Sequence, residues 1–586
     1  MFILGISCFY HDASAALLRD GKIVAAAQEE RFTRKKHDVS FPINAIEYCL
    51  KSQNISINDI DCIGFYEKPF LKFERVLYQH LESFPKSYKT FVSLMPSWFN
   101  EKLRIIKIIK KKLKYKKNVL FIEHHLAHAA ACFLISPFKK SAILTVDGVG
   151  EWTTTAYGIG DENNITLLKE IKFPSSIGLL YSTITAYLGF SVNNSEYKVM
   201  GLSPYGNMDK KTNPYYEKLK KVIDIKEDGS YRLEMDYFIF HYSNKMPSRK
   251  LCELLDGPIR KPESELTQRH KDIAAALQLI TEEVVIKMLN HIYKVTKCEN
   301  LVLGGGVALN SVCNGKILKN TPFKSIWMQP DPGDGGTSIG AVAYIYYTLF
   351  NKPRNYFLKD ACLGPGFSYE EIRKFLNDNN IKYRELKNEK ELIKETAKLI
   401  SDDNVVGWFQ GRMEWGPRAL GNRSILSNAC NPKMQEILNL KVKHREKFRP
   451  FAPVVCEDDA LKYFECDKPI PLPTDFMLMV YPVKKQWQKK IPAVTHVDGS
   501  GRLQSIRRSQ NPAYYGLIKE CGKLSGIPII INTSFNIRGE PIVCTPYDAY
   551  KCMMGTGIDY LVMDKFLIKR EDNLQDAWDS EKYAKD

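Results

Sequence analysis

Three widely separated stretches of this chain combine a strand-like run with a glycine-containing turn. Residues 2–7 and a second apolar run that ends at Leu18 lead through a tight RDG turn into KIVAAAQEE. The pattern returns in SAILTVDGVGEWTTTAYGIG from residue 141, and again in ENLVLGGGVALNS from residue 299, where three glycines lead into a helix. Although no exact repeat is present, this pattern predicts a nucleotide-binding α/β fold assembled from two related halves.

The length predicts more than one domain, because 586 residues exceed what one hydrophobic core usually organises. A clear helical pattern at 271–293 belongs to the first part, and Pro and Gly interrupt the pattern at 350–360. Beyond this point, helical patterns at 369–402 and the strand-like fragments NVVGWFQ and IPIIINTSFN predict a second α/β domain.

Cysteine usage and hydropathy predict the cellular setting. The 14 cysteines form no CxxC pair, which argues against a zinc ribbon and against a disulfide framework. No run of about 18 apolar residues is present, and the first residues lack the basic region and cleavage site of a signal peptide. We therefore expect a cytoplasmic protein that does not associate with a membrane.

The formal charge of +17 raises the question of an anionic partner. The densest basic segment, residues 101–120, spaces Leu103, Ile106, Ile109 and Leu113 on one helical face and surrounds them with lysines. This pattern predicts a solvated surface helix, or a patch for an anionic substrate, a nucleic acid or a membrane surface. Charge alone does not choose among these.

A candidate metal site combines two histidines with two aspartates. His124 and His128 are four residues apart in an apolar helical stretch and so share one face, whereas His125 points elsewhere. Asp147 follows a strand in DGVGE, and Asp334 lies in the glycine-dense turn DPGDGGTSIGA. Together these four residues would form a mixed nitrogen and oxygen site suited to Fe²⁺, Mn²⁺ or Zn²⁺.

Two further segments of the first part indicate chemistry. The glycines Gly304, Gly305 and Gly306 would let the backbone approach a nucleotide between a strand and a helix, although the segment is neither a Walker A loop nor GxGxxG. Near the N-terminus, His11 lies beside Asp12 where the first strand should end. An imidazole there could act as a general base.

The second domain is rich in arginines held in short loops. A guanidinium in a glycine-rich or proline-flanked turn has few orientations, which suits bidentate binding of phosphate or carboxylate. A turn of small hydrogen-bonding residues follows the strand near 531 and could hold an oxyanion or a carbonyl. The candidates are Arg412, Arg418, Arg423, Lys441, Lys443, Arg445, Lys447, Arg449, Arg502, Asn532, Thr533, Ser534 and Asn536.

These segments together resemble the O-carbamoyltransferases that modify antibiotics, nodulation factors and toxins, the NodU/CmcH type. The resemblance rests on an ordered series of motifs along nearly the whole chain. They are HDASAALLRDGKIVAAAQEERFTRKKHD, HHLAHAA, DGVGEWTTT, EYKVMGLSPYG, GGGVALN, DPGDGGTSIGA, GRMEWGPRALGNRSIL, KFRPFAP, THVDGSGRLQ and NTSFNIRGEPIV.

The resemblance implies an architecture and a reaction. Residues 1–355 would form an actin-like ATPase (ASKHA) fold, and residues 356–586 a YrdC-like α/β domain. The second domain would form carbamoyl adenylate and pyrophosphate from carbamoyl phosphate and ATP, with Mg²⁺. The first domain would then transfer the carbamoyl group to a substrate hydroxyl and release AMP.

The resemblance also assigns roles to residues. A metal ion would bind His124, His128, Asp147 and Asp334. Fe²⁺ is the first expectation, and Mn²⁺ and Zn²⁺ are the alternatives. His11 would deprotonate the acceptor, with Asp12 beside it. Nucleotide contacts in the first domain would come from Gly304, Gly305, Gly306, Asn310 and Lys198. Contacts to ATP and carbamoyl phosphate in the second would come from Arg418, Lys443, Arg449, Arg502, Asn532, Thr533 and Ser534.

The sequence leaves the identity of the carbamoyl acceptor open. A small metabolite or sugar hydroxyl is the first expectation. The net charge of +17 also permits a nucleic acid, such as a hydroxymethylated cytosine in DNA or a tRNA. An actin-fold kinase or a nucleotide-dependent binding protein is a third reading, which leaves the arginine-rich second domain unexplained. The family resemblance also permits a homodimer.

Overall fold

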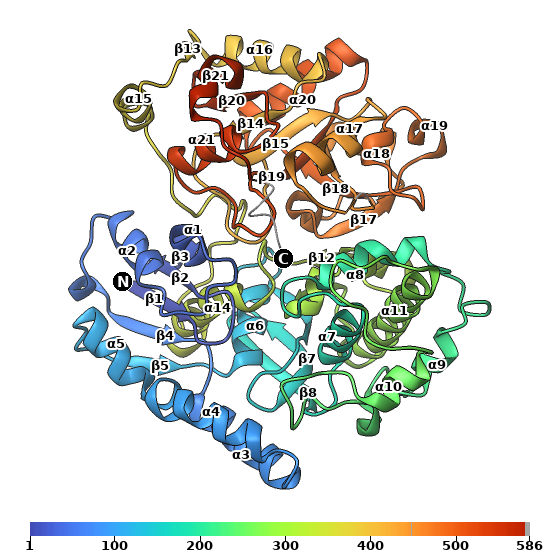
Figure 1. The fold of residues 1–586 in the computed structure, drawn as a ribbon. Coiled ribbons are helices and arrows are strands. Elements are labelled where there is room, and N and C mark those ends of the chain that lie inside the picture. Colours follow the sequence, from blue (N-terminus) through green and yellow to red (C-terminus); the bar gives the residue numbers. More distant parts are fainter. Residues whose placement is uncertain (447, 581–586) are drawn as a thin grey trace. The chain divides into compact units, whose positions relative to one another are not determined.

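The computed structural model describes residues 1–446 and 448–580, in two compact units (Figure 1). The first comprises Met1–Ala26 and Val39–Leu358, and the second comprises Ala27–Asp38 and Lys359–Asp586, whose last six residues lie outside the described part. The division at Leu358 lies close to the expected boundary at 355. The sequence did not indicate that residues 27–38 would join the second unit.

The first sheet of the first unit has five strands in the order β3-β2-β1-β4-β5. The central strand β1 pairs antiparallel with β2 and parallel with β4. The predicted RDG turn joins β2 to β3, and both Asp20 and Gly21 have the positive φ that a tight type I′ turn requires. The strands are β1 (Phe2–Ser7), β2 (Ser14–Arg19), β3 (Lys22–Gln28), β4 (Cys62–Phe65) and β5 (Val119–Phe121).

The second sheet of this unit repeats the topology. Its order is β12-β11-β6-β7-β8, and the central strand β6 again pairs antiparallel with its successor and parallel with the strand on its other side. The strands are β6 (Lys140–Val146), β7 (Thr153–Asp161), β8 (Asn164–Lys172), β11 (Asn300–Gly304) and β12 (Ser325–Trp327). The repeated strand order agrees with the expectation of two related halves.

Two helices link these halves. Helix α6 (His124–Phe133) packs against β6 and β11, and α14 (Thr337–Ala343) packs against β1 and β2. The two helices also pack against each other, at a point where a Cβ on Gly340 would lie 1.9 Å from the carbonyl oxygen of Ala127. Glycine at this crossing therefore permits the close contact that brings the N-terminal ends of both helices to one place.

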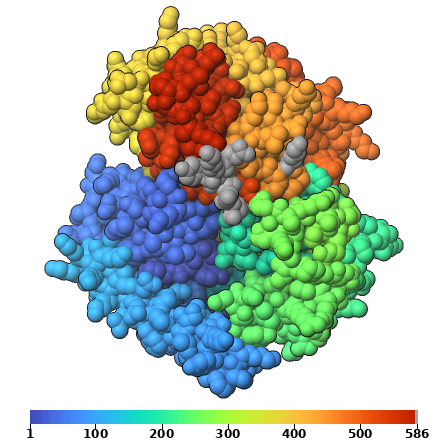
Figure 2. All heavy atoms as spheres, in the orientation of Figure 1, coloured from blue at the N-terminus to red at the C-terminus, as the bar shows by residue number. Residues whose placement is uncertain are grey.

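The two halves differ mainly in their connections. Between β4 and β5 lie α3 (Pro69–Glu82), α4 (Tyr88–Asn100) and α5 (Ile105–Leu113). Figure 2 shows this part of the chain at the surface. The second half has its long insertion elsewhere, between β8 and β11, and it ends with α11 (Gln268–Thr296), which covers the helix expected at 271–293.

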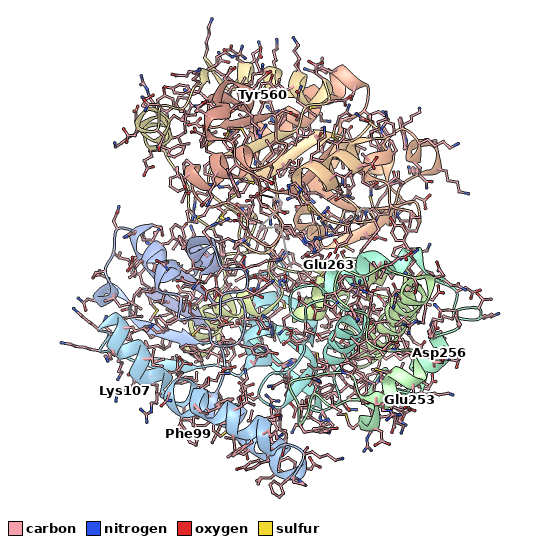
Figure 3. The ribbon with its side chains drawn as sticks, in the orientation of Figure 1. Phe99, Lys107, Glu253, Asp256, Glu263 and Tyr560 are labelled. Carbon is pink, nitrogen blue, oxygen red and sulfur yellow. The ribbon has the colours of Figure 1, made fainter. Side chains whose placement is uncertain are left out.

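The basic segment 101–120 is only partly helical. Helix α5 buries Ile109 and Leu113 as expected, but it buries Ile105 in place of Ile106, which is 44% exposed. The expected face was therefore wrong at one position, because the helix starts at Ile105 after a separate turn at Lys102–Arg104. The lysines lie on the outer side, where Figure 3 labels Lys107.

The second unit is built on a nine-stranded mixed sheet in the order β13-β21-β20-β14-β15-β19-β16-β18-β17. Helices α16 (Glu389–Ser401) and α20 (Pro512–Ser525) pack together beside it, around buried Trp408, Ile400 and Leu517. The strands are β13 (Arg384–Glu385), β14 (Val406–Phe409), β15 (Arg423–Asn428), β16 (Ala452–Cys456), β17 (Met479–Pro482), β18 (Ser500–Ile506), β19 (Ile529–Ser534), β20 (Tyr560–Met563) and β21 (Phe566–Lys569).

Residues 27–38 belong to this second unit through specific hydrogen bonds. Arg31 donates to the carbonyl oxygen of Gly416 at 2.9 Å, and Arg34 donates to those of Ile542 and Pro541 at 2.7 and 2.8 Å.

Both units combine helices and strands, so the protein is of the mixed α/β class. Within the described ranges, no helix combines the length and apolar character needed to cross a membrane.

Candidate metal centre and anion site

The start of helix α6 positions two imidazoles one above the other. The carboxylate of Glu151 accepts the backbone N–H of His124 at 3.1 Å from each oxygen, which satisfies one of the free N–H groups at the helix start. His128 follows one turn later, and the two Nε2 atoms lie 3.1 Å apart. Both rings are buried, so their polar atoms need partners within the protein or a bound ion.

Two aspartates from the other half complete this cluster. Asp147 follows β6, and its Oδ2 lies 3.2 Å from His124 Nε2. Asp334 follows β12, and its Oδ1 lies 3.6 Å from His124 Nε2 and 3.5 Å from His128 Nε2. One donor atom from each of the four residues lies within 4.8 Å of every other, so the structure brings all four predicted ligands together.

The geometry of this cluster suits a cation. Donors that share one ion at bond lengths of about 2.1 Å lie about 3.0–3.4 Å apart at angles of 90–109°. Both carboxylate oxygens of Asp334 are buried without a hydrogen-bond partner, and two imidazole Nε2 atoms face each other across 3.1 Å. The four residues could therefore bind a metal ion, and the nitrogen and oxygen donors fit Fe²⁺, Mn²⁺ or Zn²⁺.

Electrostatic interactions separate these ligands from His125. Burial opposes charge on all of these groups, yet Asp334 and Asp147 raise the pKa of His124 to about 9. The hydrogen bond with His124 and the neighbouring imidazoles in turn hold the pKa of Asp147 well below its usual range. Burial and the two neighbouring imidazoles lower the pKa of His125 to about 3, and its Nδ1 pairs with Thr145 at 2.8 Å, so it lies outside the cluster as expected.

His11 lies at the edge of the same cluster. Its Nε2 is 3.6 Å from Asp334 Oδ2, and its Nδ1 is 2.9 Å from Asp12. Burial favours the neutral ring, but Asp334 and Asp12 together raise the pKa of His11 to about 10. The expected role as a base therefore requires that a cation offset the charge of Asp334.

The glycine loop after β11 is joined to this cluster. Gly306 donates its N–H to Asp147 Oδ1 at 2.8 Å, and Gly305 has a φ of +87°. Any side chain at Gly305 would meet the carbonyl oxygen of Val146, because a Cβ would lie 2.2 Å from it. Glycine at position 305 is therefore required for this loop to pack against the end of β6, beside Asp147.

The two other predicted nucleotide contacts are engaged within the protein. Asn310 caps a short helix by accepting the N–H of Cys313 at 3.0 Å, and its side chain exchanges hydrogen bonds with Gln278 at 3.0 and 3.1 Å. The buried ammonium of Lys198 lies over the ring of Phe190, 5.6 Å from its centre. Nucleotide binding by these residues stays a prediction.

In the second unit, Lys443 is a buried cation surrounded by neutral oxygens. Its ammonium donates to the carbonyl and the hydroxyl of Ser534, and to Asn536 Oδ1 at 2.8 Å and O at 3.0 Å. None of the described residues places a carboxylate within ion-pair distance of it. Burial and the adjacent Arg445 and Arg449 hold the pKa of Lys443 well below its usual range. An anion bound here would relieve this repulsion.

The other predicted contacts of this unit have unequal roles. Arg412 and Arg423 donate to backbone carbonyls and so hold the loop at 411–423, whereas Arg418 is half-buried on it. Asn532 donates to Gln504 at 2.6 Å and to Ala419 at 3.1 Å, and its Oδ1 has no partner.

The remaining predicted contacts are only partly buried. They are Arg449 and Arg502, together with Thr533 near the end of β19. The candidate Lys447 lies outside the described residues.

Sequence reasoning missed two groups that shape these sites. Glu151 fixes the start of α6, and its place as the last residue of DGVGE was a signal for it. Glu414 organises the arginine loop, because one of its oxygens accepts the N–H groups of Leu420, Asn422 and Arg423. A glutamate inside a glycine-rich stretch offered no comparable signal.

Comparison with known proteins identifies relatives over most of the chain. Residues 2–343 match the family model described as carbamoyltransferase N-terminus, and residues 397–570 match the carbamoyltransferase C-terminus. The chain is 34% identical to nodulation protein NolNO of Sinorhizobium fredii, over 97% of this chain and 80% of that protein. It is 45% identical to the uncharacterized protein sll1178 of Synechocystis, over 97% and 96% respectively.

Solved structures show only distant similarity. Component A of (R)-2-hydroxyglutaryl-CoA dehydratase from Acidaminococcus fermentans matches at 13% identity with a TM-score of 0.33, over 59% of this chain and 97% of that one. HypF of T. kodakarensis matches at 13% identity with a TM-score of 0.29, over 58% and 47%.

Proposed function

Because this chain belongs to the carbamoyltransferase family, we propose that it is an ATP-dependent O-carbamoyltransferase that works through carbamoyl adenylate. The second unit, as a YrdC-like module, makes the adenylate. The first unit, as an actin-like module, transfers the carbamoyl group to the hydroxyl of a small metabolite or sugar. The observation that carries the proposal is the buried cluster of His124, His128, Asp147 and Asp334 beside His11.

The balance of atoms defines the steps. Hydrolysis of carbamoyl phosphate gives carbamate and phosphate, and a carbamate oxygen then attacks the α-phosphorus of ATP so that pyrophosphate leaves. In the second stage the acceptor oxygen attacks the carbamoyl carbon, and the bond to AMP breaks. Activation is required because a neutral alcohol is a weak nucleophile, and AMP is a good leaving group once its charge is offset.

In the second unit, cations hold the phosphates. The ammonium of Lys443 is fixed by Ser534 and Asn536, so it does not need to be ordered when an anion binds. Arg449 and Arg418 supply guanidinium forks that suit phosphate oxygens. Asn532 has a free carbonyl oxygen, which can accept a hydrogen bond from the carbamoyl amide.

In the first unit, His11 accepts the proton of the acceptor hydroxyl through Nε2. Asp12 holds the other ring nitrogen at 2.9 Å and so fixes the tautomer of the ring. The glycine loop, which Gly306 joins to Asp147 by a hydrogen bond at 2.8 Å, would lie beside the AMP phosphate. A metal ion held by the four ligands would supply positive charge that stabilises the leaving phosphate.

The decisive experiment measures pyrophosphate and AMP release from ATP and carbamoyl phosphate across an acceptor panel of sugars, nucleosides and hydroxymethylated DNA. We expect pyrophosphate without an acceptor, and AMP with a mass gain of one carbamoyl group on one panel member. The absence of carbamoyl-phosphate-dependent pyrophosphate under every condition would refute the adenylate mechanism and favour a kinase-like activity.

A nucleic acid is the second candidate acceptor. The observation that favours it is the exposed basic surface at α5, where Lys107, Lys110 and Lys111 lie beside Arg104. Binding to duplex DNA that falls steeply with ionic strength would support this acceptor. Transfer to free sugars that is insensitive to salt would support the small molecule.

A further inference from the structure

A second group of charges lies at the base of helix α3, in the long β4–β5 connection of the first half. Lys72 and Arg75 are only 5% and 6% exposed, and both project from the same face of the helix, three residues apart. Charged side chains are rarely buried to this degree unless each has an opposite charge. Lys72 has such a partner in Glu67, whereas Arg75 has none among the described residues.

Arg75 has no carboxylate partner. One terminal nitrogen donates to the amide oxygen of Gln79 at 3.1 Å, and the guanidinium lies over the ring of Phe173 at 4.9 Å from its centre. Its Nε is buried without any hydrogen-bond partner. No acid among residues 1–446 and 448–580 lies within ion-pair distance, so this is a buried and uncompensated cation, which destabilises a folded protein unless a ligand completes it.

The nearest carboxylates are engaged with other groups and do not pair with Arg75. Glu67 is the near carboxylate, but it is paired with Lys72 at 2.5 Å. Glu151 accepts the backbone N–H groups of His124 and Lys68, so its oxygens are engaged. A third cation, Lys102, is close enough that burial and Lys72 lower its pKa to about 8. Glu67 and Glu151 favour the charged form of Arg75 only from a distance, and burial still lowers the pKa of Arg75 to about 10.

The charged residues of α3 lie close to the cluster of His124, His128, Asp147 and Asp334 through two intervening residues, Tyr10 and Tyr66. The ammonium of Lys72 lies over the ring of Tyr10, 4.8 Å from its centre, and Tyr10 directly precedes His11. Tyr66 directly precedes Glu67, and its ring contacts the ring of His124 at 5.6 Å between centres. Lys72, which lies one helical turn from Arg75, is thus one layer of side chains away from the residues proposed to perform the transfer.

We propose that Arg75, assisted by Lys72, binds an oxyanion of the carbamoyl acceptor, so that the acceptor is an acid: a hydroxylated carboxylate, sulfate or phosphate ester. This inference rests on the proposed function. A guanidinium presents a planar fork that matches such groups with two parallel hydrogen bonds. In the proposed function the nucleotide phosphate binds at the glycine loop beside Asp147, in the other half of the first unit. Arg75 is therefore available to bind the acceptor.

The first test compares matched acceptors with the full-length protein. Two quantities are measured with each of glucose, glucuronate and glucose 6-phosphate. They are the release of AMP that depends on the acceptor and the rise in Tm that the acceptor causes. We expect the acidic members to be favoured at least tenfold in kcat/KM or to raise Tm where glucose does not. The absence of any preference for an acid in both measurements would overturn the proposal.

The second test replaces the cation. Arg75→Gln should lower kcat/KM for the acidic acceptor by about 10–100-fold, mainly through KM, and change acceptor-independent pyrophosphate release less than twofold. Arg75→Lys should restore part of the loss, because the charge returns without the fork. An equal loss with acidic and neutral acceptors would show that Arg75 binds the nucleotide phosphate or only supports the fold.

A stability measurement separates the ligand role from a structural one. Without ligand, Arg75→Met should raise Tm by about 1–4 °C, because it removes a buried unpaired charge and keeps the contact with Phe173. A lower Tm would identify Arg75 as a structural residue. If Arg75→Met does not fold, Lys72→Met provides the second variant, which should weaken the acidic acceptor alone. Pyrophosphate release that persists while acid preference is absent would refute this inference and leave the proposed function intact.

Discussion

The two halves of the first unit share one strand order but place different side chains at matching positions. The turn between β1 and β2 carries His11 and Asp12, and the matching turn between β6 and β7 carries Asp147. The helix after β5 begins at His124, and the matching segment after β12 begins at Asp334. The repeated scaffold therefore delivers four equivalent chain positions to one place, where the residues have diverged.

Because the residues have diverged, the candidate metal site combines nitrogen and oxygen donors. The first half supplies both imidazoles, and the second half supplies both carboxylates. Neither half contains a complete site, so the centre exists only when α6 and α14 pack together. The long connections differ as well: the first half places α3–α5 after β4, where the second half has only the glycine loop and two short helices. Matching topology thus determines where chemistry occurs, and the local sequence determines which chemistry.

The largest effect should follow from removing an imidazole of the first half. His124→Ala should abolish bound metal and lower carbamoyl transfer by about 10³-fold, because charge stabilisation by a metal ion contributes several kcal/mol. Pyrophosphate release should persist, since the proposed function assigns it to the second unit. Metal analysis by mass spectrometry and AMP release measure both. The matched control is His125→Asn, which keeps a donor to Thr145. Normal transfer by His124→Ala would show that the metal assignment is wrong.

A change in the second unit should leave both halves of the first intact. Lys443→Met should lower pyrophosphate release by roughly 10²–10³-fold, because it removes a fixed cation from the anion site. Bound metal should be unchanged. Lys441→Met serves as the control, since Lys441 is exposed two residues away. Equal loss of activity in both variants would mean that general charge, and not this buried ammonium, matters. Arg449→Ala should also lose adenylate formation.

The role of His11 distinguishes a base from a ligand. His11→Ala should lower transfer by about 10²-fold through loss of general base catalysis and leave metal content unchanged. Asp12→Asn should have a smaller effect, because the ring stays in place but its tautomer is less strictly fixed. Loss of metal in His11→Ala would instead make His11 a fifth ligand from the first half.

The smallest effect tests how the carboxylates of the second half act on the imidazoles of the first. The pKa of His124, raised from 6.5 to about 9, means that the metal-free ring is protonated below pH 9, and a metal must displace that proton. Metal affinity should rise about tenfold per pH unit from pH 7 to 9 and then level off. His125→Asn should show the same slope, since His125 is neutral in this range. A flat profile would contradict the charge coupling.

Several local features could be predicted from the sequence. The RDG turn, the strand at 529–534 and the helix at 271–293 follow from turn chemistry and periodicity. The shared face of His124 and His128 follows from helix geometry alone. The grouping of these histidines with Asp147 and Asp334 was predicted from the type of turn in which each aspartate lies, and the four donors do lie together.

Other features depended on packing between distant segments. The apolar face of α5 includes Ile105 in place of Ile106, because its start is set by the turn that precedes it. No local pattern marks Arg75 as buried, yet the fold leaves it only 6% exposed beside Phe173. The binding of residues 27–38 to the second unit depends on carbonyl groups of Gly416, Pro541 and Ile542, which no local pattern encodes.

The sequence by itself determined the chemical inventory and the local geometry: which donors exist, and which of them share a turn or a helix face. Short-range steric rules govern these features, so they are present in any fold that the chain adopts. Only the tertiary structure decided which donors meet, which cations lose their partners and which segment joins which unit. Those outcomes depend on the burial of apolar surface between segments far apart in the chain, and this driving force is not directional in sequence.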